Sequence, residues 1–171
     1  MITRGFDLMT HSTNKPLTVI TVIIAVITLT AEGDDKTANK RKIDRMKVEL
    51  SAQGTPPGTM KFAKSEIKIK AGQPIQFTFK NPDVLQHNLL ILKPGTITKV
   101  GALADAMLTD PEAMKKSYIP KSPDILHSTK LVNPGGQAVL EFTITEAGNY
   151  PIICTFPGHW RLMSAVLKVV K

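Results

Sequence analysis

Short stretches in which apolar and polar residues alternate constrain the fold of this chain more than any other feature. Apolar residues at every second position are typical of strands that bury one face. Ile75–Phe79 is the clearest example, Ile67 and Ile69 alternate with lysines, and turn residues such as Asn81–Asp83 separate the runs. The remaining predicted strands are Val48–Leu50, Leu89–Leu92, Val139–Ile144, Tyr150–Cys154 and Ser164–Val170. Seven or eight short strands in roughly 120 residues predict an all-β Greek-key sandwich.

One segment has helical rather than strand periodicity. Thr98–Met107 is predicted to be a helix, and its expected apolar face consists of Val100, Leu103, Ala104 and Met107. A second short helix is predicted after it, because Asp110 is a favourable N-cap and Pro111 suits a first helical turn. Because so long a connection is unusual in a compact domain, we expect this short helical excursion to pack across one end of the sandwich.

The N-terminal part of the chain has a different composition. Arg4 and Lys15 precede an apolar run from Leu17 to Ala31, which fits the core of a signal peptide better than a bilayer span of about 20 residues. Cleavage after Ala31 would place Leu29, which is not a small residue, three positions back, so an uncleaved membrane anchor stays open. A buried core segment is the weakest alternative. We therefore assign residues 1–31 to a signal peptide or N-terminal membrane anchor and expect a periplasmic or other extracytoplasmic location, with residues 17–31 as the membrane tether if the leader is retained.

Charged residues follow this leader. Residues 32–45 are predicted to be a polar, charged linker, and residues 46–171 to be the folded domain. The formal net charge of the chain is +8, but most basic residues are lysine and only 5% of the residues are aromatic. This profile argues against nucleic-acid binding, which relies on arginine forks and stacking rings. It favours an acidic partner or an anionic membrane surface.

Side chains that bind metals are concentrated near the C-terminus. Three of them lie within one short, turn-rich segment: Cys154, His159 and Met163. Pro157 and Gly158 supply the bend that lets such a segment curl its donors around one point. A fourth donor, His87, lies at the entrance to the apolar run Leu89–Leu92. Two imidazoles, a thiolate and a weak axial thioether are the donor set of a blue-copper site.

Other uses of these residues stay open at this point. Copper is favoured over zinc because a thioether contributes little to zinc, which prefers four strong donors. Cys154 as a catalytic nucleophile paired with His87 or His159 is the main rival, although it leaves the position of Met163 unexplained. The alternative without metal binding or catalysis is that Cys154 and Met163 are ordinary buried core residues. The single cysteine excludes an intrachain disulfide.

With these residues in view, the chain resembles the cupredoxins, the type 1 blue copper family of plastocyanin and azurin, and it resembles the azurins most closely. The segment Cys154–His159, followed by Leu162 and Met163, has the ligand spacing of the azurin loop. His87-Asn88 before an apolar strand is similar to the upstream ligand segment of that family. The resemblance covers roughly residues 46–171.

The resemblance implies a set of ligands. His87, Cys154 and His159 would form the trigonal plane around one type 1 copper ion, and Met163 would be the distant axial ligand. In the same family the second histidine of the site serves as the port for electrons, which here implies His159, followed by Trp160 where azurins have a small residue.

The resemblance also implies roles for neighbours of the ligands. Asn88 and Thr155 would join the two ligand segments by hydrogen bonds, and the backbone N–H groups of Asn88 and Phe156 would point at the sulfur of Cys154. Gln86 stands where azurins have a glycine whose carbonyl approaches the copper.

The function that follows is that of an electron carrier rather than an enzyme. The donor set leaves no open coordination position for a substrate, and the chain has too few histidines for a second copper site. The resemblance implies single-electron transfer between redox proteins, such as a c-type cytochrome, by Cu(I)/Cu(II) cycling. A periplasmic copper-binding carrier or chaperone is the alternative, and a hydrolase that uses Cys154 is a more distant one.

Overall fold

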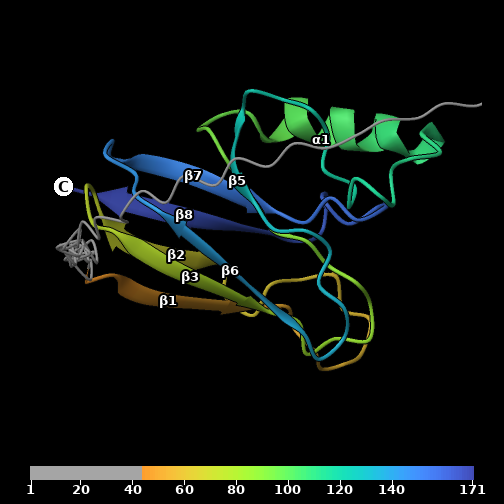
Figure 1. The fold of residues 1–171 in the computed structure, drawn as a ribbon, viewed down its shortest axis with the longest axis horizontal. Helices are drawn as coiled ribbons and strands as arrows, with labels where there is room; N and C mark the ends of the chain where they lie inside the picture. Colours follow the sequence, from red (N-terminus) through yellow and green to blue (C-terminus); the bar gives the residue numbers. More distant parts are fainter. Residues whose placement is uncertain (1–43) are drawn as a thin grey trace, which may run out of the picture. The chain divides into compact units, whose positions relative to one another are not determined.

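The computed structural model describes residues 44–171, so the predicted leader and nearly all of the predicted linker lie outside the described residues. The described part contains eight strands and one α-helix (Figure 1). Their bounds are β1 Met46–Ser51, β2 Glu66–Lys70, β3 Ile75–Lys80, β4 Leu90–Leu92, α1 Ile97–Ala106, β5 Ile125–Ser128, β6 Gln137–Phe142, β7 Gly148–Ile153 and β8 Ser164–Val170. No helix within residues 44–171 is long and apolar enough to cross a bilayer.

The strands form two sheets that pack face to face. One sheet has the strand order β1-β3-β6, and the other has the order β2-β8-β7-β4-β5. The pairs β1–β3 and β2–β8 are parallel, and the remaining pairs are antiparallel. Ile75, Phe77 and Phe79 of β3 point into the core between the sheets, which is the alternation expected from the sequence. The predicted all-β sandwich with a short helical excursion is confirmed.

The run Leu89–Leu92 does not alternate because both of its faces are covered. Leu89 and Ile91 belong to the main core between the sheets, whereas Leu90 and Leu92 pack with Val100 of α1 in a second apolar cluster. Helix α1 therefore lies on the outer face of the five-stranded sheet (Figure 1). For α1, the expectation of packing across one end of the sandwich is wrong.

The helical excursion differs from its prediction in two details. Leu103, expected on the buried face of α1, is 37% exposed. Met107–Thr109 form a short 3-10 helix, and the second helix expected after Asp110 is replaced by turns. Asp110 does cap this segment, since its Oδ1 accepts a hydrogen bond from the N–H of Glu112 at 2.8 Å.

The turn at Ser117 and Tyr118 explains why a helix does not continue there. Both residues have positive φ angles, 55° and 53°, which regular helices do not contain. Their carbonyl groups accept hydrogen bonds from the side chains of Asn88 and Thr155, each at 2.7 Å. Tertiary partners therefore take the place of helical hydrogen bonds in this segment.

Strand β5 was not among the predicted strands. It pairs with β4 at the edge of the five-stranded sheet. All four of its residues are half-buried, so they show no alternation of the kind that identifies a strand in sequence.

Candidate metal centre

A ten-residue loop carries three of the four predicted ligands. Cys154 directly follows β7, and Met163 directly precedes β8. The N–H of Cys154 donates to the carbonyl of Met163 at 3.1 Å, and the N–H of Met163 donates to the carbonyl of His159 at 2.8 Å. Gly158 has a φ of 80°, which allows the bend before His159. Backbone hydrogen bonds thus close the loop, and the three metal-binding side chains lie on one short connection between β7 and β8.

His87 reaches the same place from a distant part of the sequence. It lies between β3 and β4 and forms an isolated antiparallel bridge with Val132. The N–H of His87 donates to the carbonyl of Val132 at 3.2 Å, and the N–H of Val132 donates back at 2.7 Å. This bridge fixes the backbone from which the imidazole projects.

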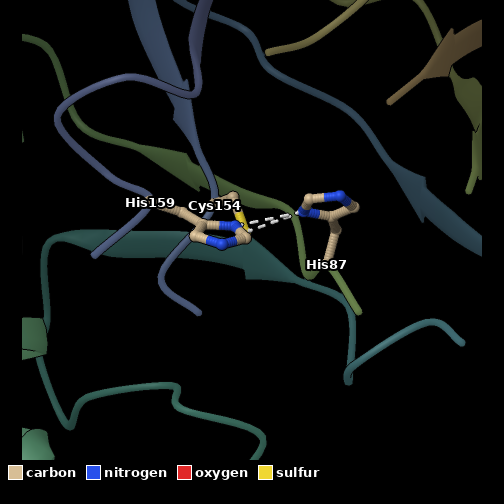
Figure 2. A group of neighbouring side chains, drawn as sticks. All are labelled: His87, Cys154 and His159. Atoms are coloured by element: carbon tan, nitrogen blue, oxygen red, sulfur yellow. Dashed lines mark hydrogen bonds between the residues drawn. The ribbon is translucent and has the colours of Figure 1, made fainter. Parts of the chain in front are cut away.

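The three strong donors converge on one point. The Nδ1 atoms of His87 and His159 are 3.2 Å apart, and the sulfur of Cys154 lies 3.8 Å from the first and 3.6 Å from the second. Figure 2 shows the three side chains pointing toward one another. The point equidistant from all three atoms is about 2.1 Å from each, which is close to the metal–nitrogen and metal–sulfur distances of protein sites. The geometry therefore suits a single transition-metal ion.

All four predicted ligands are removed from solvent. His87, Cys154 and Met163 are 0% exposed and His159 is 3% exposed. Among the described residues, His87, Cys154 and His159 are the group of His, Cys, Asp and Glu side chains close enough together to hold a metal ion. Thiolate and imidazole donors with a buried thioether nearby favour copper over harder cations.

Burial also sets the protonation states of the metal-free site. It raises the pKa of the Cys154 thiol to about 12, although hydrogen bonds from the backbone N–H groups of Phe156 and Asn88 act in the opposite direction. Burial lowers the pKa of His159 to about 4, assisted by the neighbouring charge of His87 and opposed by Asp83. A protonated, buried thiol is a poor nucleophile, which disfavours the cysteine-hydrolase alternative.

Asn88 and Thr155 connect the two ligand segments. The side-chain amide of Asn88 donates to Oγ1 of Thr155 at 2.9 Å, and the N–H of Thr155 donates to Oδ1 of Asn88 at 2.7 Å. Both side chains also donate to carbonyls of the turn at Ser117 and Tyr118. The pair of hydrogen bonds expected between Asn88 and Thr155 is present, and it extends to a third segment.

Gln86 and Phe156, two predicted neighbours of the ligands, make different contacts. The side chain of Gln86 donates to Oδ1 of Asn133 at 2.6 Å in an exposed position. The ring of Phe156 packs against the ring of His159, with centroids 4.9 Å apart. Phe156 thereby covers part of the imidazole.

Trp160 packs on α1. A Cβ atom placed on Gly101 would come within 2.5 Å of the indole ring, so the glycine makes room for it. The indole N–H donates to Asp105 at 2.9 Å, and Arg161 binds the same carboxylate through both of its terminal nitrogens. The guanidinium of Arg161 also lies 4.3 Å from the indole centroid. The half-buried indole is thus fixed beside His159.

Asp83 contacts a predicted ligand, although its place in the sequence predicts only a turn residue. Oδ2 of Asp83 lies 3.0 Å from Nε2 of His87, and both side chains are fully buried. An acidic residue four positions before a predicted histidine ligand is the signal that was available in the sequence.

Comparison with known proteins agrees with this geometry. The model of the family described as copper binding proteins, plastocyanin/azurin family, matches residues 45–170. Auracyanin-A of Chloroflexus aurantiacus is 32% identical over 124 residues, which cover 71% of this chain and 73% of the relative. Azurin-1 of Alcaligenes xylosoxydans xylosoxydans is 30% identical over 121 residues, which cover 65% of this chain and 90% of the relative.

Solved structures give the same result. Auracyanin A of Chloroflexus aurantiacus, described as a "blue" copper protein, superposes with a TM-score of 0.64 at 32% identity, covering 74% of this chain and 100% of that one. Dithionite-reduced auracyanin of Roseiflexus castenholzii also gives a TM-score of 0.64, at 29% identity, covering 75% of this chain and 100% of that one. Since the family model spans nearly all of the described residues, the chain belongs to the plastocyanin/azurin family of copper-binding proteins.

Proposed function

We propose that this protein binds one copper ion in a type 1 site and carries single electrons between redox partners, without catalysing a reaction itself. His87, Cys154 and His159 would hold the ion in a plane, and Met163 would be its axial ligand. The observation that carries this proposal is the buried triangle of two imidazole nitrogens and one sulfur, with sides of 3.2, 3.6 and 3.8 Å. A bound copper ion supplies the one-electron couple.

The protein's contribution is to keep the donors still. Electron transfer is fast when the metal ligands move little between the two oxidation states. Here, hydrogen bonds between separate segments of the chain hold the ligands in place. The Asn88–Thr155 hydrogen bonds hold the two ligand segments together, and the His87–Val132 bridge fixes one of them to a further segment. Burial of the donors excludes water, which would otherwise add a ligand.

Electrons would enter and leave at His159 and Trp160. His159 is the ligand with measurable exposure, at 3%. Trp160 beside it is half-buried, and Leu162 on the same loop is 57% exposed. A redox protein that docks on this loop would come close to the imidazole through an apolar contact.

The location and domain organisation belong to this proposal as well. Residues 1–31 would direct export or tether the protein to a membrane, residues 32–45 would be a linker, and residues 46–171 would work outside the cytoplasm. The apolar run and the basic residues before it support this assignment. The partners would be extracytoplasmic redox proteins, with a c-type cytochrome as one candidate.

A redox titration of the full chain, loaded with one equivalent of Cu(II), tests the function. We expect repeated cycles of ascorbate reduction and hexacyanoferrate(III) oxidation to transfer one electron per protein, with copper retained in the presence of excess EDTA. The variant Cys154→Ser is the control and should lose the reversible couple. Release of copper to the chelator on reduction would contradict the proposal and favour the copper-carrier alternative.

A further inference from the structure

Asp83 is a buried carboxylate that touches a predicted ligand. It is 1% exposed, and its Oδ2 lies 3.0 Å from Nε2 of His87. The imidazole presents its other nitrogen, Nδ1, to the sulfur of Cys154 and to Nδ1 of His159. The carboxylate therefore contacts the side of the ring that faces away from the proposed ion.

Two backbone N–H groups hold the other oxygen of the carboxylate. Oδ1 accepts hydrogen bonds from the backbone N–H groups of Gly58 and Val84, both at 2.7 Å. Burial raises the pKa of Asp83, but the hydrogen bonds from Gly58, His87 and Val84 outweigh it and leave the pKa below its ordinary value. Two backbone N–H donors on one oxygen and an imidazole nitrogen 3.0 Å from the other suit the ionised form of this buried group.

An anionic carboxylate determines which nitrogen of the imidazole carries hydrogen. It only accepts hydrogen bonds, so Nε2 of His87 is the donor, and in the neutral imidazole the lone pair is then on Nδ1. The carboxylate itself cannot turn away, because two backbone N–H groups hold Oδ1 and the N–H of Asp83 donates to Oδ1 of Asn81 at 3.1 Å.

We propose that Asp83 is a positioning residue of the metal centre that fixes His87 as its Nε2–H tautomer and lowers the reduction potential of the bound ion. The first part does not depend on copper. The second part rests on the proposed function: a buried negative charge next to a ligand stabilises the more positive ion, Cu(II), relative to Cu(I).

The tautomer is tested in the metal-free, full-length protein by long-range ¹H–¹⁵N correlation spectra of the imidazoles at pH 8. We expect His87 to show the Nε2–H pattern. In Asp83→Asn, the amide oxygen should face the N–H groups of Gly58 and Val84, so its NH₂ group would face Nε2 and shift His87 toward the Nδ1–H form. An Nδ1–H pattern in the unaltered protein would overturn the proposal.

The effect on the metal is tested by the reduction potential of the copper-loaded proteins. In Asp83→Asn we expect the ratio of Cu(II) to Cu(I) affinity to fall about tenfold, which raises the potential by about 59 mV. Glu141→Gln is the matched control, because it removes the same charge at the exposed surface, where Glu141 pairs with Arg45. Glu141 lies opposite Gln76, near the start of β3, whereas His87 follows the end of that strand. A shift in Asp83→Asn no larger than in the control would overturn this part.

The two measurements separate this inference from the proposed function. If the unaltered protein bound copper without a thiolate-to-copper absorption band, the proposed function would fail while the tautomer result still decided the role of Asp83. If the blue site formed normally and both the tautomer and the potential were insensitive to Asp83→Asn, only the inference about Asp83 would fail.

Discussion

Cys154 is the residue on which the proposed chemistry depends most. Its thiol is buried, has a pKa of about 12 and receives hydrogen bonds from two backbone N–H groups. In the metal-free protein it is therefore protonated at every pH at which the protein would work. A metal that binds the thiolate has to displace this proton.

The number of protons released on copper binding shows whether the metal displaces the thiol proton of Cys154. At pH 8, Cu(II) binding should release about one proton per site from Cys154, while His159 contributes none because its pKa of about 4 leaves it neutral. Copper affinity should accordingly fall as the pH decreases, since protons compete for the sulfur, and fall further near pH 4, where His159 also takes up a proton. An indicator dye in weak buffer records the release. Binding without proton release would mean that the sulfur is not a ligand, and Cys154→Ser is the control that should release none.

Thr155 shows how a neighbour of the ligands contributes to stability. Its hydroxyl donates to the carbonyl of Tyr118 at 2.7 Å and accepts from the amide of Asn88. Thr155→Val keeps the shape of the side chain but removes the donor to the Tyr118 carbonyl and one of the two acceptors of the Asn88 amide. We expect the free energy of unfolding of the metal-free protein to fall by about 1–3 kcal/mol, measured by urea denaturation. The exposed Thr143→Val is the matched control, and equal effects of the two substitutions would contradict the role given to Thr155.

At the scale of elements, the contact between α1 and the ligand loop is the one with the sharpest steric requirement. The backbone of Gly101 lies against the indole of Trp160, so that a Cβ atom there would be 2.5 Å from the ring. Gly to Ala inside a helix usually stabilises a protein by about 0.5–1 kcal/mol. Here the methyl group has to displace a large ring that is also bonded to Asp105.

Gly101→Ala should therefore destabilise the protein, by about 1–3 kcal/mol, and shift the fluorescence of Trp160, which is the only tryptophan. Both effects are measured in one urea titration. In the background Trp160→Ala, the same substitution should become neutral or stabilising, because the obstructing ring is gone. A gain of stability from Gly101→Ala in the unaltered background would show that the helix and the loop do not pack as described.

Local signals in the sequence identified most of these elements, and non-local contacts account for the errors. Strand β3 was predictable because its residues alternate between core and solvent. The turns at residues 111–118 were not, because the conformation of Ser117 and Tyr118 is tied to hydrogen bonds from Asn88 and Thr155, which are distant in sequence. Likewise, β5 is stabilised by pairing with β4 rather than by a pattern of its own.

At the scale of the whole molecule, the charge bears on the choice of partner. The formal net charge is +8, and oppositely charged surfaces accelerate encounter in a way that salt weakens. We expect oxidation of the copper-loaded, reduced protein by anionic hexacyanoferrate(III) to slow as salt is added. Oxidation by cationic tris(phenanthroline)cobalt(III) should accelerate under the same conditions. Stopped-flow rates that are independent of salt for both reagents would rule out electrostatic steering.

The candidate site was largely predictable for a different reason than the fold. Cys154, His159 and Met163 are close in sequence, so their spacing alone indicates that they bind one metal ion. His87 was identified from its position before an apolar strand. Asp83 was missed because a single acidic residue in a turn is an ordinary feature. Its carboxylate accepts a hydrogen bond from the N–H of Gly58, a residue that no spacing in the sequence connects to it.

Visible absorption and electron paramagnetic resonance of the full chain with one equivalent of Cu(II) test the central claim most directly. A thiolate and two imidazoles in a plane around copper should give an intense blue thiolate-to-copper absorption band and a narrow copper hyperfine splitting, and Cys154→Ser should abolish both. A colourless protein with the wide splitting of tetragonal Cu(II) would contradict the account, because it would mean that His87, Cys154 and His159 do not hold copper together.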